Sequence, residues 1–302
     1  MEKLRLLFLL LFFLLFWGCS YILPKEKRLK KIALVIGNEN YVSNRLQNPI
    51  HDATAIAEVL KRMGFYVLLK ENLSLNKFYL ALDELKENIE VDNTILFFYF
   101  AGHGNTLNKS SSEEYLMMTD RDKKVLISIY KLYDFLNSVK AKHNIVVIDA
   151  CRDYQENYLP IESHKNRSYI SRKRGDKEFK NFRGNFRATF VKGEETSLPE
   201  LIIHDDDSIG LFPQSTIISY ATMHNQIAKD WSIYDKNHSP YTRALIKYLD
   251  DEEIPIEEVF RRVRIELIEE TNRQQINLEE NSLEKNVWLV PKKVENSLFS
   301  PI

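Results

Sequence analysis

The chain has 302 residues and carries 42 lysine and arginine residues against 43 aspartate and glutamate residues, so its net charge is close to zero. This balance lacks the basic excess of a nucleic-acid-binding protein, and we expect no nucleic-acid partner. The only two cysteines, Cys19 and Cys151, argue against a disulfide framework and exclude a cysteine-rich zinc site. Hydrophobic residues make up 44% of the chain, enough for one large α/β domain with extensions or for two small domains.

The first residues, 1–20, resemble a secretion signal. A short basic stretch precedes an unbroken apolar run from Leu6 to Trp17, which suits a signal peptide but is short for a membrane span. The run ends at a glycine and Cys19, which resembles a bacterial lipoprotein site, although Trp17 departs from the usual pattern. We expect an exported chain anchored in the bacterial cell envelope through a lipid on Cys19. The alternative is an uncleaved N-terminal anchor, and either way Cys151 is the only thiol left for chemistry.

Strands alternate with helices along the rest of the chain. Continuous apolar runs predict buried strands, and apolar residues recurring every three or four positions predict helices. The predicted strands are Ile32–Ile36, Phe65–Leu69, Thr94–Phe100, Asn144–Ile148, Ser215–Tyr220 and Val287–Val290, with a short hairpin piece at Tyr115–Met118. The predicted helices are Pro49–Arg62, Ser74–Ile89, Ile127–Val139, Ser239–Leu249 and Ile256–Thr271. This alternation predicts an α/β fold with a mostly parallel sheet of about six strands and helices on both faces.

These elements predict one domain with one long interruption. We expect a linker at residues 21–30, the domain at 31–292 and a C-terminal tail at 293–302. Residues 154–212 show little periodicity and include a basic stretch, so they are predicted to form a long loop insertion. Three interpretations of this insertion stay open: a site of self-cleavage, a contact with anionic lipid, and an ordinary solvated loop.

Two reactive residues follow the ends of predicted strands. His103 follows the third predicted strand, and Cys151 follows the next buried strand, 48 residues further on. Sites in open parallel sheets form beyond the carboxyl ends of the strands, so the two side chains would meet if their strands are neighbours. An imidazole beside a thiol can take its proton and later protonate a leaving amine. The backbone N–H groups of Gly104 and Cys151 would then form an oxyanion hole.

Six segments in a fixed order carry a family resemblance. They read ALVIGNENY (33–41), NPIHDATAIAEVLKRMGF (48–65), LFFYFAGHG (96–104), IVVIDACRD (145–153), ISYAT (218–222) and SPYTRAL (239–245). Together they resemble the caspase-like cysteine peptidase domain, and its bacterial metacaspase and paracaspase-type members more than animal caspases. The resemblance covers about residues 31–290 apart from the insertion. It implies a three-layer caspase-like sandwich and a cysteine endopeptidase that acts through a thioester acyl-enzyme, with His103 as base and Cys151 as nucleophile.

The resemblance also implies how a protein or peptide substrate would be held. In metacaspase-like members, acids at the positions of Asp52 and Asp149 line the S1 pocket and select arginine or lysine at P1. Each acid has a plainer interpretation, since Asp52 would favour the first turn of its helix and Asp149 would hold the turn after its strand. Tyr220 and Ala221 are expected to border the substrate cleft, and the loop that contains Asp230 and Trp231 is a further candidate for shaping the pocket. Ordinary loop packing is the alternative for these residues.

No metal or cofactor is predicted. Several metacaspases need calcium, but Asp120, Asp122 and Asp153 lack the spacing of a recognisable calcium loop, so activation by calcium is left open. The alternative to an enzyme is a catalytically silent envelope scaffold or protein-binding module with the same fold. The presence of both reactive residues favours the enzyme. A metal hydrolase finds no support, because the histidines show no paired spacing.

Overall fold

The computed structural model describes residues 28–290 except 43, 107–112, 122, 154–188, 191–199 and 205–209. The expected leader with Cys19, most of the linker and of the insertion, and the tail at 293–302 lie outside the described residues. Within the described ranges, no helix combines the length and the apolar character needed to cross a bilayer.

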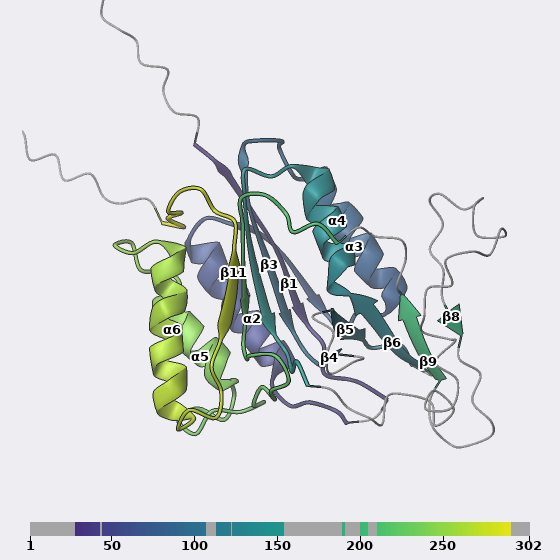
Figure 1. Cartoon of the computed structure of the whole chain (residues 1–302). Coiled ribbons are helices and arrows are strands. Elements are labelled where there is room, and N and C mark those ends of the chain that lie inside the picture. Colours follow the sequence, from purple (N-terminus) through teal and green to yellow (C-terminus); the bar gives the residue numbers. More distant parts are fainter. Residues whose placement is uncertain are drawn as a thin grey trace, which may run out of the picture.

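A six-stranded sheet with the order β11-β10-β7-β3-β1-β2 forms the centre of the molecule (Figure 1). Its strands are β1 (Lys30–Gly37), β2 (Tyr66–Glu71), β3 (Thr94–Ala101), β7 (His143–Asp149), β10 (Thr216–Tyr220) and β11 (Leu278–Asn281). All neighbours pair in parallel except β10 and β11, which are antiparallel. The predicted sheet of about six mostly parallel strands is confirmed.

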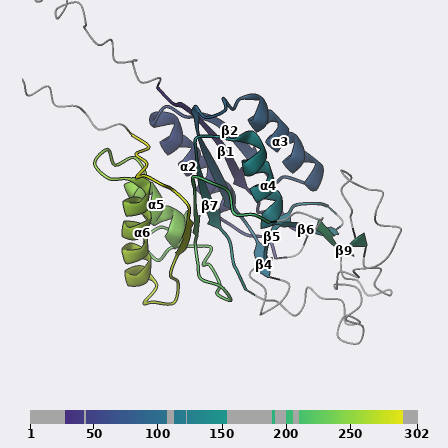
Figure 2. The ribbon, with the colours of Figure 1, turned by 45° about the horizontal axis from the view of Figure 1, so that its top comes forward.

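Helices cover both faces of this sheet (Figures 1 and 2). One face carries α2 (Pro49–Arg62), α5 (Pro240–Tyr248) and α6 (Ile256–Glu270), and the other carries α3 (Leu75–Glu87) and α4 (Ile129–Val139). Every residue of β3 is buried. Phe97 and Tyr99 pack in the hydrophobic core beneath α2, α5 and α6, and Phe98 and Phe100 pack in the core beneath α3 and α4. Successive side chains of a strand point to opposite faces, so a strand covered on both sides is apolar throughout. This is why the sequence revealed β3 so clearly.

A second, smaller sheet follows the carboxyl end of β3. Its strands, in the order β4-β5-β6-β9-β8, are β4 (Gly104–Thr106), β5 (Glu114–Met118), β6 (Lys123–Ser128), β9 (Glu200–His204) and β8 (Thr189–Phe190). The backbone of β9 pairs in parallel with β6. Part of the segment predicted as a long loop insertion, 154–212, is therefore strand. The apolar run of β9, residues 201–203, is short, and its partner strand lies far away in the sequence, so local patterns did not predict this pairing.

The start of the predicted helix Ile127–Val139 is wrong by two residues. Residues 127 and 128 belong to strand β6, and helix α4 begins at Ile129. Ser128 caps the helix, because its side chain accepts a hydrogen bond of 3.2 Å from the backbone N–H of Tyr130. Ile127, which the prediction assigned to the helix, therefore belongs to the strand before it.

The predicted last strand at Val287–Val290 is also wrong, because the last strand is β11. Val287 and Leu289 are buried outside any strand, and the Val287 carbonyl accepts a 2.8 Å hydrogen bond from the N–H of Ile256 at the start of α6. β11 reads Leu-Glu-Glu-Asn and lies at the edge of the sheet, where charged residues are tolerated. Its polar sequence hid it from an analysis based on apolar runs.

Candidate active site

The order of the strands reverses between β1 and β3. From β1 the chain runs outward to β2, and it then returns past β1 to β3, β7 and β10. Open α/β sheets bind their ligands beyond the carboxyl ends of the strands at such a switch point. The segments that follow β1, β3 and β7 therefore surround the place where a site is expected.

His103 and Cys151 leave this edge from neighbouring strands. β3 and β7 pair in parallel, and Ala101 and Asp149 face each other at their ends. The two segments stay side by side beyond the strands, so that His103 and Cys151 occupy facing positions two residues further on. The backbone hydrogen bonds that join them, each 3.2 Å long, run from Gly102 N–H to the Asp149 carbonyl and from Thr106 N–H to the Asp153 carbonyl.

Gly104 lies directly against the backbone of the candidate nucleophile. A Cβ atom added at this position would be 2.4 Å from the carbonyl oxygen of Cys151 and 2.9 Å from Cβ of Ala150. Backbone atoms cannot move aside cheaply, so only glycine fits here. The close approach brings together the two residues whose N–H groups were predicted to form the oxyanion hole, and that role stays a prediction.

The ring of His103 is held by the segment that follows β1. Its Nε2 lies 2.6 Å from the carbonyl oxygen of Asn44. Because a carbonyl oxygen only accepts, Nε2 carries the proton and Nδ1 is the acceptor nitrogen of the neutral ring. Tyr41 supports this arrangement, since its ring centroid is 4.5 Å from that of His103 and its hydroxyl accepts the His103 backbone N–H at 2.9 Å. Burial lowers the pKa of His103, so the ring is neutral and able to accept a proton near pH 7.

Cys151 is a neutral thiol in this state. Its Sγ donates to the carbonyl oxygen of Ala228 at 3.5 Å and accepts the Ala228 N–H at 3.3 Å. Burial raises the pKa of Cys151 to about 11, and the negative charges of Asp149, Asp153 and Asp230 act in the same direction. A thiol with this pKa becomes a nucleophile only when a nearby base removes its proton during the reaction.

Asp52 and Asp149 are both buried at the N-terminus of α5. The Ser239 N–H lies 3.2 and 3.3 Å from the two carboxylate oxygens of Asp52. The hydroxyls of Ser239 and Thr242 donate to Asp149 Oδ2 at 2.5 and 2.7 Å. Burial and then the neighbouring Asp149 raise the pKa of Asp52 well above its usual range, and burial raises the pKa of Asp149 to about 6. The two acids thus lie together, and in this state both are hydrogen-bonded to the protein.

Asp230 and His238 complete this acidic site. Asp230 Oδ2 accepts the Gln47 N–H at 2.8 Å, and its negative charge contributes to the raised pKa of Asp52. His238 Nδ1 lies 2.8 Å from Asp52 Oδ1. Among the described residues, no lysine or arginine forms an ion pair with Asp52, Asp149 or Asp230. Sequence reasoning had marked the loop of Asp230, but it missed His238, which is 186 residues from Asp52 and carries no motif of its own.

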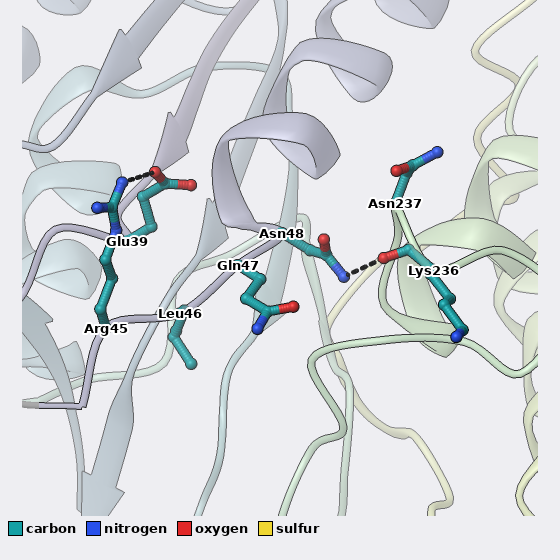
Figure 3. Close-up of a pocket in the computed structure, with 7 residues that line it drawn as sticks. All are labelled: Glu39, Arg45, Leu46, Gln47, Asn48, Lys236 and Asn237. Atoms are coloured by element: carbon teal, nitrogen blue, oxygen red, sulfur yellow. Dashed lines mark hydrogen bonds and ion pairs between the residues drawn. The ribbon is translucent and has the colours of Figure 1, made fainter.

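An open depression of about 620 Å³ adjoins the acidic site (Figure 3). It is lined by Glu39, Arg45, Leu46, Gln47, Asn48, Lys236 and Asn237. The side chain of Asn48 joins its two walls by donating to the carbonyl oxygens of Asp230 and Lys236, at 2.5 and 2.9 Å. Neither His103 nor Cys151 lines the depression, so it borders the site without containing the reacting groups.

Comparison with known proteins agrees with this geometry. Residues 30–288 match the family model of the caspase domain. The chain belongs to the caspase family. Members of this family are cysteine peptidases that act on proteins, and the expected caspase-like fold is confirmed.

Two solved caspases show the likeness in three dimensions. The chain is similar to the Drosophila initiator caspase Dronc, with 12% identity and a TM-score of 0.56 over 91% of this chain and 90% of that one. It is similar to Caspase-1 from Spodoptera frugiperda, with 13% identity and a TM-score of 0.56 over 88% of this chain and 92% of that one. At these identities the likeness shows the fold alone. No curated protein matches the chain.

Tyr220 and Ala221 lie behind the nucleophile segment of this caspase domain. Both side chains are buried, at 1% and 0% exposure, so a role at the border of the cleft stays a prediction. The guanidinium of Arg152 lies over the Tyr220 ring, 3.8 Å from its centroid, and is paired with the buried Glu114. Arg152 is fully buried and directly follows Cys151, so this pair anchors the segment that carries Cys151. Sequence reasoning quoted Arg152 within a motif but assigned it no role.

Asp120 and Asp153, two of the three acids considered for calcium, lie at different elements of this caspase domain. Asp120 accepts the Leu75 N–H at 3.0 Å at the start of α3, while Asp153 follows β7. Asp122 lies outside the described residues. In the part of the chain that the structure describes, no three histidine, cysteine or acidic side chains are grouped as metal ligands.

Proposed function

We propose that this caspase-family protein is a cysteine endopeptidase of the metacaspase type, which cleaves peptide bonds after arginine or lysine through Cys151 and His103. The observation that carries the proposal is the parallel pairing of β3 with β7, which sets the two residues at facing positions on the carboxyl edge of the sheet. Membership of the family supports cysteine peptidase activity in general. The assignment of the dyad and of the P1 preference is our proposal.

The first half of the reaction forms an acyl-enzyme. His103 Nδ1 takes the thiol proton as Cys151 Sγ attacks the carbonyl carbon of the peptide bond, and the electron pair of the C=O bond moves to oxygen. The N–H groups of Gly104 and Cys151 stabilise that oxyanion. When the carbonyl re-forms, the C–N bond breaks and the imidazolium protonates the departing amine, which leaves a thioester on Cys151.

Water completes the cycle. His103 removes a proton from a water molecule that attacks the thioester carbonyl, and the proton then passes to the departing Cys151 sulfur. The carbonyl of Asn44, which accepts the Nε2–H at 2.6 Å, holds the ring in one tautomer and favours its cationic form. Burial of the dyad suits this reaction, because it keeps the imidazole and the thiol neutral until the thiol proton is transferred during the attack.

The P1 preference rests on the charge of the acidic site. Asp52, Asp149 and Asp230 bring three carboxyl groups to one place without a lysine or arginine partner among the described residues. Burial of such a group without a cation is unfavourable for its charged form. A P1 arginine or lysine would supply the missing cation at the position where the metacaspase resemblance puts the S1 pocket.

The proposed location is the bacterial cell envelope, with a lipid on Cys19 or an uncleaved leader as the tether. The apolar run that ends at Cys19 supports this location. Membrane fractionation of cells that express wild-type protein or Cys19→Ser tests it. Recovery of both proteins in the soluble fraction would overturn a tether of either kind. A lipid anchor predicts that mass spectrometry finds the lipid on the wild-type protein and not on Cys19→Ser.

The activity is tested with fluorogenic peptides that end in arginine, lysine or aspartate. The full-length protein is compared with Cys151→Ala, and Cys19→Ala serves as the matched control because it removes the other thiol. We expect hydrolysis after arginine and lysine by the wild-type and Cys19→Ala proteins only. Equal rates with and without Cys151 would overturn the nucleophile, and cleavage after aspartate but not arginine would overturn the S1 proposal. No hydrolysis by any of the three proteins would favour the silent scaffold.

A further inference from the structure

His238 contacts the carboxyl group that the proposed function assigns to a P1 cation. Its Nδ1 lies 2.8 Å from Asp52 Oδ1, and its side chain is only 19% exposed. Asp52 is 2% exposed and reaches no other side chain by a hydrogen bond among the described residues, since its remaining partner is the backbone N–H of Ser239. Among the described residues, the imidazole is thus the only side chain that hydrogen-bonds the buried carboxyl group of Asp52.

Hydrogen bonds fix the backbone of His238, whereas its ring is free to change rotamer. The His238 carbonyl accepts the Ser232 N–H at 2.7 Å, and the His238 N–H donates to the Asp235 carbonyl at 3.2 Å. Ser232 is tied in turn to the buried Glu270, which also accepts the Ile233 N–H at 3.0 Å. These bonds fix both ends of the turn, so the ring can leave Asp52 by a change of side-chain rotamer without unfolding the turn.

Both nitrogen atoms of the ring lie near acidic groups. Nδ1 is 2.8 Å from Asp52 Oδ1 and Nε2 is 3.9 Å from Asp235 Oδ2, and the charges of Asp149 and Asp230 also act on Asp52. Burial lowers the pKa of His238 and Asp235 opposes that effect. A neutral imidazole contributes one N–H to Asp52, whereas a guanidinium or ammonium contributes a full charge and several donors. A basic side chain is therefore a stronger partner for Asp52 than the residue that holds it now.

We infer that His238 is a specificity-determining residue, a resident occupant of the S1 pocket that a P1 arginine or lysine must displace from Asp52. The inference rests on the proposed basic P1 preference and extends it. In the unliganded enzyme the ring keeps Asp52 hydrogen-bonded. A cationic P1 side chain replaces that bond with a better one, while an uncharged P1 side chain in the place of the ring would leave the buried Asp52 with the Ser239 N–H alone. His238 thereby sets the affinity for basic substrates and excludes neutral ones.

A first experiment measures the competition directly. Kinetics with an arginine-terminated peptide compare full-length wild-type protein, His238→Ala, and His51→Ala, which removes an exposed histidine one residue from Asp52. We expect His238→Ala to lower KM about tenfold with kcat nearly unchanged, the equivalent of losing one competing hydrogen bond to a charged group. His51→Ala should leave both constants as in the wild type. An unchanged or raised KM in a folded His238→Ala protein would overturn the inference.

A second experiment needs neither hydrolysis nor a change at His238. Full-length Cys151→Ala protein is treated with diethylpyrocarbonate, and carbethoxylation of His238 is followed by mass spectrometry with butylguanidinium or with its uncharged analogue butylurea. Displacement of the ring from Asp52 predicts that butylguanidinium accelerates modification of His238 severalfold and that butylurea does not. Equal rates with both compounds, or protection of His238 by butylguanidinium, would overturn the inference.

The two experiments separate this inference from the proposed function. Acceleration by butylguanidinium in a protein that hydrolyses no peptide would support the displacement and refute the peptidase. Efficient cleavage after arginine with unchanged KM in His238→Ala, and no effect of butylguanidinium, would support the peptidase and refute the displacement.

Discussion

Raising the pH should accelerate the alkylation of Cys151 by iodoacetamide up to about pH 11, because only the thiolate reacts. The pKa of Cys151 is raised by burial to about 11, against an ordinary value of about 8.5. At pH 7.5 this difference makes the thiolate about 300 times scarcer than in an unperturbed cysteine. We therefore expect alkylation in the folded protein to be slower than in the unfolded chain by about two orders of magnitude.

The assay uses Cys19→Ser protein, so that Cys151 is the only thiol. The rate of carbamidomethylation is followed by mass spectrometry between pH 6 and 11, and the same protein in concentrated urea provides the unperturbed reference. A folded-state rate at pH 6 to 7 that equals or exceeds the reference and does not change with pH would refute the reasoning. It would mean that a thiolate–imidazolium pair exists before substrate binds.

The same raised pKa links Cys151 to stability. Because the folded protein holds the thiol protonated, this group stabilises the fold fully below the pKa of the unfolded chain, near 8.5. The contribution is lost as the pH rises from there toward 11. The wild-type protein should therefore lose more stability than Cys151→Ala between pH 8 and 11 in chemical denaturation, and parallel losses would contradict the assigned protonation state.

Three substitutions test the supports of the site. Gly104→Ala should lower kcat about 100-fold, because its Cβ would lie 2.4 Å from the nucleophile's carbonyl oxygen and shift that segment. A wild-type kcat would show that the two backbones are not in contact. Tyr41→Phe removes the acceptor of the His103 backbone N–H and should lower kcat about tenfold with little change in KM. A loss of about tenfold in peptide affinity in a binding assay would argue that Tyr41 does not act by positioning His103. Arg152→Met removes the arginine from the buried Glu114, which keeps only His224 at 3.3 Å, and should cost about 3–5 kcal/mol in the free energy of unfolding. Adding Glu114→Gln should recover much of that loss in thermal denaturation, and an additive double variant would contradict the pairing.

Much of the domain could be predicted from local patterns. β1, β3, β7 and β10 are buried runs, and helices α2, α3, α5 and α6 have apolar faces that repeat every three or four residues. His103 and Cys151 could be identified because a reactive residue directly after a buried parallel strand lies at the edge where such sheets bind ligands. These features depend on residues close together in the sequence, so the sequence alone determined them.

The tertiary structure decided which segments come together. β11 is polar because it lies at an edge, so it had no apolar run to reveal it, and the short apolar run of β9 becomes a strand only through its backbone pairing with β6. The hydrogen bond between Asn44 and His103 joins residues 59 positions apart, and the one between His238 and Asp52 joins residues 186 positions apart. Contacts between loops depend on where the sheet brings their ends, which no local periodicity encodes. The sequence by itself therefore determined the sheet and the candidate pair at its edge, His103 and Cys151, whereas only the tertiary structure decided the tautomer of His103, the protonation of Cys151 and the hydrogen bond between His238 and Asp52.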